Sequence, residues 1–419
     1  MKISILIPIY NVEKYLRHCL NSVLNQKDIK DVDLDIVLVD DGSTDSSLDI
    51  AIEYAKKDER IFILSKKNAG LSTARNAALE LTKGTKLRAY LDKKIKEDFF
   101  IKSYKNTHSF DKSDIKKLSK DDIDKVFTRL DERVYKTELS DINDFIIQDL
   151  SPDTYVHFLD SDDYLDKKCI STCLRKLKDD LDLYLHNVSS VDEEDELIKE
   201  KIYLKANLSF GSYAKGLDFL QDNKLYDFYF AYQGAFRASL LNSYKLRFIK
   251  HIYHEDHDFA IILFASSSKI FVDDEVLLYY RSRSGSIISS MQDDTYPKKL
   301  PFYLETLKAS FKSYKKLRRY YKAYCFCKSA IFVFNFYEEK INLEPSFKSY
   351  KSFFTKAILN LIQIFKISLK VDPLNIKKML QAFSFKKRTI LFFFLKDLHR
   401  QPKKLRYIKN LRYLLKDKK

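Results

Sequence analysis

Apolar positions in residues 1–84 follow two alternating patterns. Short, almost continuous apolar runs predict buried strands, and three of them occur, at 3–9, 34–39 and 61–64. Between and after them, apolar residues recur at helical spacing, which predicts helices, with Asn11 capping the first and Asp45 the second. Repeated strand–helix–strand units of this length predict a parallel sheet with right-handed crossovers, and therefore an α/β fold.

The strand–helix alternation stops after residue 84. Residues 85–150 are dense in Lys and Asp and have helical apolar spacing only in part. We interpret this segment as a helical insert at the rim of the sheet, with a solvated charged hairpin as the default alternative. A further apolar run at 154–159 predicts that the sheet resumes there.

The chain of 419 residues is long enough for two or three domains, and its 45% hydrophobic content supports a substantial core. Seven Gly and seven Pro are too few for a turn-rich β architecture or a disordered chain. The five cysteines have no disulfide-framework spacing, which indicates a reducing, cytoplasmic compartment. Cys169 and Cys173 have the spacing of half a zinc site. Because a second pair is missing, we expect them to be two small apolar residues one helical turn apart.

The first apolar run is short, contains Pro8 and is soon followed by the acidic Glu13. We therefore interpret it as a strand rather than a secretion signal. No run approaches the roughly 20 apolar residues of a membrane-spanning helix. The chain is expected in the cytoplasm.

The net charge of +16 is concentrated at one end of the chain. Residues 301–419 contain 29 Lys/Arg against 7 Asp/Glu, whereas residues 1–300 contain 46 against 52. Within the basic part, residues 351–370 combine helical apolar spacing with flanking lysines. Such a helix can lie on an anionic membrane surface, or it can pack on its neighbours with a solvated basic face. Nucleic acid also suits a basic surface rich in Tyr and Phe.

Two apolar runs stop abruptly at clustered carboxylates, in the segments 37–45 and 157–163. Ligands of open α/β sheets bind just beyond the carboxyl ends of the strands, so both clusters are expected on one rim and to face one ligand. Crowded carboxylates repel one another unless a cation or a hydrogen-bond donor holds them. The first turn lacks a G-x-G-x-x-G phosphate loop, so a nucleotide diphosphate would be held by a divalent metal and side chains.

Five short motifs occur in one order along the chain: Pro8–Asn11, Val39–Asp45, Asn68–Asn76, Leu159–Asp163 and His254–Asp256. Together they resemble the family 2 glycosyltransferases over about residues 1–84 and 152–290, but not in the insert or the basic tail. The resemblance implies a GT-A nucleotide-diphospho-sugar transferase fold, with a mostly parallel central sheet flanked by helices. It divides the chain into a catalytic domain at 1–290, interrupted by the insert at about 85–150, and a basic, mainly helical region at 291–419.

The resemblance also implies an activity. An inverting, metal-dependent enzyme of this kind moves a hexosyl or N-acetylhexosaminyl group from a nucleotide-sugar donor, expected here to be a UDP-sugar, to a glycan or lipid-linked acceptor. Bacterial members build lipooligosaccharide, lipopolysaccharide or capsule. Lipid-linked acceptors at the inner face of the cytoplasmic membrane favour an anionic membrane as the partner of residues 301–419, and no nucleic acid is expected.

The resemblance further assigns individual roles. Asp160 and Asp162 alternate at a strand end and match the metal motif, and their hard oxygens suit Mn²⁺ or Mg²⁺. Asp256 is expected to be the base that takes the proton of the acceptor hydroxyl, with Glu255 as its rival. The nucleotide-binding set is Pro8, Tyr10, Asp41, Asn68, Arg75, Asp160, Arg281 and Arg283.

Several of these residues have purely structural alternatives. Asp41 could be a turn residue, Tyr10 an interior aromatic, and Arg75 an exposed helix arginine. Arg281 and Arg283 could belong to a basic strand edge. For the whole chain, the alternatives are a nucleotidyltransferase that makes nucleotide-sugars and a nucleic-acid-binding protein. The first would need a Gly-rich basic loop after the first strand, and the second depends on the tail alone.

Overall fold

The computed structural model describes residues 1–93, 99–178, 180–205, 207–283, 294–298, 300–362 and 367–383. The chain divides into two compact units. Unit 1 comprises Met1–Phe219, Phe230–Lys250 and Ile262–Ser282, and unit 2 comprises Leu220–Tyr229, His251–Ile261 and the chain from Arg283 onward. Unit 2 therefore combines the basic C-terminal region with two short segments from the middle of the chain.

Unit 1 is built on a mixed sheet with the strand order β12-β14-β10-β13-β8-β1-β2-β3-β7-β6, to which β11 and β9 are added beside β10 and β14. The strands are β1 (Lys2–Ile9), β2 (Asp33–Asp40), β3 (Ile61–Ser65), β6 (Phe127–Asp131), β7 (Val134–Thr137), β8 (Thr154–Phe158), β9 (Tyr164–Leu165), β10 (Leu183–Val191), β11 (Leu197–Lys199), β12 (Gly211–Tyr213), β13 (Gly234–Arg237) and β14 (Ile270–Arg281). The pairs among β8, β1, β2, β3 and β7 are parallel, and β13 runs antiparallel between β8 and β10. The four predicted strands correspond to β1, β2, β3 and β8, which confirms the predicted α/β fold class.

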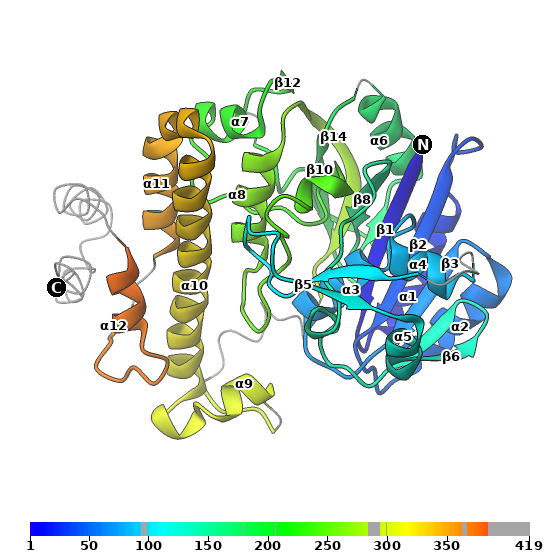
Figure 1. The fold of residues 1–419 in the computed structure, drawn as a ribbon, viewed down its shortest axis with the longest axis horizontal. Coiled ribbons are helices and arrows are strands. Elements are labelled where there is room, and N and C mark those ends of the chain that lie inside the picture. Colours follow the sequence, from blue (N-terminus) through cyan, green and yellow to red (C-terminus); the bar gives the residue numbers. More distant parts are fainter. Residues whose placement is uncertain are drawn as a thin grey trace. The chain divides into compact units, whose positions relative to one another are not determined.

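Helices cover both faces of this sheet (Figure 1). On one face, α1 (Glu13–Leu24), α2 (Ser47–Lys57) and α6 (Cys169–Leu177) share a core with Ile3, Ile5 and Ile7 of β1. On the other face, α3 (Leu71–Glu80) packs against β1 and β2. Side chains alternate between the two faces along each strand, so the two layers of helices contact different residues of the same strands. Two helices are divided between the units: α7 (Gly216–Asp222) begins in unit 1 and ends in unit 2, whereas α8 (Asp256–Ser266) begins in unit 2 and ends in unit 1.

The two predicted helix caps have different outcomes. Asn11 has a φ of +50°, and its side-chain oxygen accepts a hydrogen bond of 2.8 Å from the backbone N–H of Thr44, so its prediction as the cap of α1 is wrong. The carboxylate of Asp45 accepts hydrogen bonds from the backbone N–H groups of Ser47 at 3.0 Å and Glu13 at 3.1 Å. Asp45 therefore stabilises the starts of both α1 and α2.

The segment 85–150, predicted to be a helical insert, is mixed. It contains α4 (Lys86–Leu91), α5 (Lys120–Val126) and a 3-10 turn, but also a hairpin of β4 (Ile101–Tyr104) and β5 (Ile115–Leu118). In addition, β6 and β7 extend the main sheet beyond β3. The prediction is correct only for the helices. Four of the five residues of β6 are exposed, so this edge strand has no apolar run that a sequence pattern can detect.

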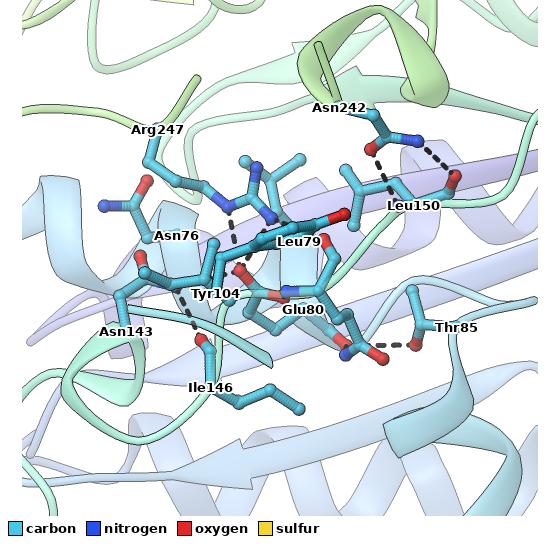
Figure 2. Close-up of polar contacts among 12 residues, drawn as sticks. Asn76, Leu79, Glu80, Thr85, Tyr104, Asn143, Ile146, Leu150, Asn242 and Arg247 are labelled. Carbon is cyan, nitrogen blue, oxygen red and sulfur yellow. Dashed lines mark hydrogen bonds and ion pairs between the residues drawn. The ribbon is translucent and has the colours of Figure 1, made fainter. Parts of the chain in front are cut away.

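Glu80, the last residue of α3, fixes two distant segments onto this helix (Figure 2). Its carboxylate accepts hydrogen bonds of 2.8 Å from both Arg247 and Asn143, and one of 3.2 Å from the backbone N–H of Gln148. The side chains of Glu80 and Arg247 are at most 1% exposed. A buried ion pair thus attaches the end of the insert and the chain around Arg247 to the sheet.

The regular elements of unit 2 are helices in its described residues. Its elements are α9 (Phe302–Glu305), η4 (Lys308–Ser310), α10 (Tyr314–Leu343), η5 (Pro345–Tyr350), α11 (Lys351–Leu361), α12 (Ile376–Met379) and η7 (Leu380–Ala382), together with the end of α7 and the start of α8. The predicted helical C-terminal region is confirmed for this part of the chain. Among the described residues, no helix is both long enough and apolar enough to cross a membrane.

The predicted amphipathic helix at 351–370 corresponds in part to α11. Its apolar residues Phe354, Ile358 and Leu361 are buried, and the ring of Phe354 stacks on Tyr337 of α10 with centroids 4.8 Å apart. Of the two open interpretations, packing on a neighbouring helix is the one observed, because this apolar face is covered within unit 2. Phe365, the last residue of the predicted stripe, lies outside the described residues.

Candidate active site

Asp41 lies directly after β2, at the carboxyl edge of the sheet. Its side chain is 4% exposed and forms an ion pair with Lys66. It also accepts hydrogen bonds from the side-chain amide of Asn68 at 3.1 Å and from the backbone N–H groups of Ala69 at 3.1 Å and Gly70 at 2.7 Å. Burial raises the pKa of Asp41, although Lys66 and the two backbone amides oppose the shift. In this structure Asp41 shapes the loop after β3, rather than standing open as an acceptor for a nucleoside base.

Lys66 is a buried cation that the sequence analysis missed. Besides the pair with Asp41, its ammonium donates hydrogen bonds to the carbonyl oxygens of Lys67 at 2.9 Å and Ser140 at 2.8 Å. Burial lowers the pKa of Lys66, although Asp41 raises it. One lysine beside another gives no signal by itself. A carboxylate expected at a buried strand end, however, needs a cationic partner, and this requirement points to the basic pair that follows β3.

Pro8 and Tyr10 stand at the end of β1. Pro8 is buried and pairs in register with Val39 of β2. Tyr10 is 49% exposed, so it is not an interior aromatic. An exposed ring at the carboxyl edge of a parallel sheet is accessible for stacking on a planar ligand.

Arg75 and Asp160 come together, which joins two motifs that are far apart in the sequence. The guanidinium of Arg75 donates a hydrogen bond of 2.7 Å to the carboxylate of Asp160. Arg75 is 2% exposed, and its guanidinium carbon lies 5.9 Å from the ring centroid of Phe158 and 5.3 Å from that of Phe248. Arg75 is therefore not an exposed helix arginine, and the anionic partner that its position in α3 calls for is Asp160.

Arg281, at the end of β14, holds the turn that carries the acidic motif. Its backbone N–H donates to the carboxylate of Asp163 at 2.8 Å, and its guanidinium donates to the carbonyl oxygen of Asp162 at 3.1 Å and pairs with Asp195 at 2.6 Å. Arg281 is 3% exposed. This arrangement does not support the expectation that Arg281 closes over a diphosphate, because its guanidinium is already engaged by the chain. Arg283 is half-buried and belongs to unit 2.

The turn from Asp160 to Asp163 fits the divalent cation that the sequence motif predicts. Burial, followed by the charges of Asp162 and Asp160, raises the pKa of Asp163 well above its usual range. Among the described residues, the Oδ2 atom of Asp163 is buried without a hydrogen-bond partner. Asp160 is already paired with Arg75, so the unpartnered buried oxygen of Asp163 is the observation that suits a cation taking oxygen ligands. Asp163 was not among the predicted ligands, because the sequence pattern favoured the alternating pair.

Glu255 and Asp256 belong to unit 2, where Asp256 is the first residue of α8. Ligand atoms of His254, Asp256 and His257 lie within 4.8 Å of one another. Burial, followed by the charge of Lys322, lowers the pKa of His254 to about 4. The Oδ1 atom of Asp256 is buried and has no hydrogen-bond partner in the described part of the chain, so it retains acceptor capacity.

Comparison with known proteins identifies the family of the N-terminal segment. Residues 4–93 match the model of glycosyl transferase family 2. The N-terminal segment belongs to family 2. This family 2 segment contains Pro8, Tyr10, Asp41, Asn68 and Arg75, and over this segment the resemblance inferred from the motifs is confirmed. With the mixed, centrally parallel sheet and its flanking helices, the fold class is the α/β GT-A fold.

The relatives of the family 2 segment match only this part of the chain. The glycosyltransferase GlyA of Streptococcus pneumoniae is 47% identical over 83 residues, which are 20% of this chain and 12% of that protein. The uncharacterized glycosyltransferase EpsJ of Bacillus subtilis is 43% identical over 83 residues, 20% of this chain and 23% of that protein. The poly(ribitol-phosphate) beta-glucosyltransferase of Bacillus spizizenii is 45% identical over 86 residues, 20% of this chain and 13% of that protein. The chain thus matches less than a quarter of the length of each of these relatives.

Among solved structures, Staphylococcus aureus TarS 1–349 in complex with UDP-GlcNAc aligns over 99% of this chain and 89% of that chain. The sequence identity is 18% and the TM-score is 0.48. A likeness at this level does not carry the ligand of that protein over to this one.

Proposed function

We propose that the chain is an inverting glycosyltransferase. It moves a hexosyl or N-acetylhexosaminyl group from a nucleotide-diphosphate donor, a UDP-sugar, to a glycan or lipid-linked acceptor in the synthesis of a cell-surface polysaccharide such as lipooligosaccharide, lipopolysaccharide or capsule. The carrying observation is the contact between Arg75 of the family 2 segment and Asp160 of the acidic turn. This contact supports one site formed by both clusters of carboxylates at the carboxyl edge of the sheet.

In the proposed site, the nucleotide lies over the ends of β1 and β2. Tyr10 stacks on the base, and the loop fixed by Asp41 and Asn68 borders it. Arg75 orients the carboxylate of Asp160, and Arg281 holds the backbone of the turn, so that both act as positioning residues. Arg283 remains the candidate for a direct contact with the diphosphate.

Asp160 and Asp162 would hold Mn²⁺ or Mg²⁺, with Asp163 beside them. When bound, the ion supplies charge neutralisation for the departing diphosphate. Arg75 balances Asp160 in the structure, so the support for a metal comes from the buried oxygen of Asp163 that has no hydrogen-bond partner among the described residues.

Asp256 is the proposed base, and Glu255 is its rival. In a single displacement the acceptor hydroxyl loses its proton as its oxygen attacks the anomeric carbon from the face opposite the nucleotide. A positioned carboxylate is able to accept that proton. The buried Oδ1 atom of Asp256 at the start of α8, which has no hydrogen-bond partner in the described residues, supports this assignment.

The experiment that tests the proposal is a panel of UDP-sugars incubated with the protein, Mn²⁺ and candidate acceptors, with released UDP as the readout. One donor is expected to give metal-dependent turnover that EDTA removes. The product should have the inverted anomeric configuration. A product with retained configuration contradicts the single displacement, and no UDP release from any donor with any acceptor argues against the transferase.

Variants sharpen this test. Asp162→Asn is expected to remove turnover while the circular dichroism spectrum stays unchanged. Asp166→Asn makes the same charge change four residues later and is expected to keep turnover. Asp256→Asn should reduce the rate by about 10²–10⁴-fold, as for loss of a general base, whereas Glu255→Gln should reduce it much less. The reverse order would assign the base to Glu255.

A further inference from the structure

A second cluster of ligand-type side chains lies inside unit 1, within the core shared by α6 and the sheet. His157 of β8, Cys169 and Cys173 of α6, and His186 of β10 are all buried. One ligand atom from each lies within 4.8 Å of the others. Each of the four side chains is at most 1% exposed.

The spacing of residues along the chain does not reveal this cluster, because only the two cysteines form a closely spaced pair. Cys169 and Cys173 are one helical turn apart on α6, but each histidine comes from a different strand. β13 lies between those strands, and its small residue Ala235 is paired with His157 on one side and with Tyr184 on the other. Tyr184 is two residues before His186 on β10, so both side chains point to the same face of the sheet. Because Ala235 carries only a methyl group on this face, the two imidazole rings meet across β13, stacked with centroids 5.4 Å apart.

The hydrogen bonds of the histidines leave two lone pairs facing each other. Nδ1 of His157 lies 2.6 Å from the carbonyl oxygen of Phe158, and Nδ1 of His186 lies 2.9 Å from that of Asn187. A carbonyl oxygen only accepts, so each Nδ1 is the protonated donor and each Nε2 is a bare acceptor. The two Nε2 atoms are nevertheless 3.1 Å apart. A cation between them turns this repulsion into attraction.

A shared proton is a poor substitute for such a cation. It would create a charged imidazolium in the core, where both histidines are at most 1% exposed and a charge without a partner is costly to bury. Moving the proton of one Nδ1 to its Nε2 would instead leave an Nδ1 lone pair against a carbonyl oxygen. The geometry therefore favours a metal ion over a proton.

The geometry points to a structural Zn²⁺ site formed by His157, Cys169, Cys173 and His186. In a tetrahedral zinc site two imidazole nitrogens are about 3.3 Å apart, and a nitrogen and a sulfur about 3.6 Å apart. The observed distances are 3.1 Å between the Nε2 atoms and 3.9 Å from the Sγ atom of Cys169 to Nε2 of His157. Two thiolates and two imidazoles in a closed, buried arrangement are a ligand set typical of zinc.

The outer hydrogen bonds support the same conclusion. A metal-ligating histidine usually donates its other ring N–H to a carbonyl or carboxylate, which fixes the tautomer and the ring orientation. Both histidines have this bond to a backbone carbonyl. The ion would join α6, β8 and β10, and β8 leads within three residues from His157 to Asp160. The zinc site does not depend on the proposed transferase activity.

The test begins with the unmodified full-length protein, purified without a metal-affinity tag and dialysed against EDTA. Elemental analysis is expected to find close to one zinc per chain. Replacement of the zinc by Co²⁺ should give thiolate-to-cobalt charge transfer in the near ultraviolet and the visible d–d bands of a tetrahedral site. Protein without zinc that also gives no such bands with Co²⁺ would overturn the proposal, as would a Cys169–Cys173 disulfide in freshly purified protein.

Variants locate the ion. Cys173→Ala should lose the zinc and lower the midpoint of thermal unfolding. Cys327→Ala, at a cysteine of α10 that is equally buried, should keep the zinc. Asp162→Asn should also keep it, which separates this site from the acidic turn. Zinc that disappears with Asp162→Asn but persists with Cys173→Ala would contradict the assignment. If Cys173→Ala fails to fold, the cobalt spectrum of the unmodified protein still decides.

Discussion

Single buried charges hold the outer segments of unit 1 onto its sheet. Glu80 and Arg247 are the clearest case, because the two side chains lie in the core and satisfy each other together with Asn143 (Figure 2). A buried pair of this kind contributes little compared with apolar packing. Removing one partner, however, leaves an uncompensated charge in the core.

Glu80→Gln is therefore expected to lower the free energy of unfolding by about 3–5 kcal/mol, because Arg247 stays buried without a counter-charge. The measurement is urea unfolding followed by circular dichroism. Glu53→Gln is the matched control. It removes a carboxylate that pairs with Arg17 and Lys57 on the surface, and it should leave the midpoint nearly unchanged. Equal effects of the two substitutions would contradict the assigned role of the buried pair.

Asp258, the third residue of α8, gives a second prediction for a single residue. It accepts a hydrogen bond of 2.7 Å from the hydroxyl of Ser329, and burial raises its pKa from 3.8 to about 7. Because the folded form binds the proton more tightly than the unfolded form, this carboxyl group stabilises the fold fully below about pH 4. That contribution is lost as the pH rises toward 7.

The measurement is the thermal midpoint of the original protein and of Asp258→Asn between about pH 4 and pH 8. As the pH rises to about 7, the midpoint of the original protein should fall relative to that of Asp258→Asn. Above that pH the difference between the two midpoints should stay constant. Taking the difference cancels the opposite trend expected from His254. A difference that stays constant over the whole range would show that Asp258 ionises as an exposed carboxyl group does.

At the scale of elements, the apolar patterns predicted the strands and helices that lie in a two-sided core. β1, β2, β3 and β8 have largely apolar sequences because both of their faces are covered. The edge strand β6 could not be found, because its side chains are mostly exposed. The fold class and the acidic turn thus followed from local patterns, whereas the strands of the insert did not.

The candidate site was predictable to the extent that its residues lie at strand ends. The contact of Arg75 with Asp160 and the zinc-type cluster depend on which strands become neighbours. Spacing along the chain does not contain that information. The buried Lys66 and the structural use of Arg281 were missed for the same reason, since each partner lies on another element.

The end of β14 supplies a prediction for the acidic turn. Arg281→Lys keeps the charge, but an ammonium cannot reproduce the fork that reaches both Asp162 and Asp195. Because Arg281 orients the residues around the proposed metal, the Mn²⁺ concentration for half-maximal UDP release should rise by about 10–100-fold. Arg175→Lys, on the exposed side of α6, is the control and should leave this concentration unchanged. If the Mn²⁺ concentration for half-maximal UDP release is the same for both variants, Arg281 does not position the residues of the proposed metal site.

At the scale of the whole molecule, the basic charge must be considered apart from α11. The apolar face of α11 is covered by α10, so it does not provide a lipid-binding surface. The highest remaining density of positive charge is in the sequence 384–419, with 13 Lys/Arg against 2 Asp/Glu. Basic residues close to an anionic membrane contribute about 1 kcal/mol each. Peripheral binding is therefore expected to come from this charge.

The full-length protein should consequently sediment with vesicles that contain phosphatidylglycerol and stay in solution with vesicles of phosphatidylcholine alone. Binding should disappear at about 1 M salt, where the Debye length falls to about 3 Å, because the attraction is electrostatic. Duplex DNA added as a competitor separates the two classes of partner. If the protein prefers DNA to anionic vesicles, the basic region is a nucleic-acid-binding surface. If it sediments equally with both kinds of vesicle, binding depends on apolar groups that enter the lipid rather than on charge. Salt-sensitive binding to the anionic vesicles alone would place the proposed transferase next to lipid-linked acceptors.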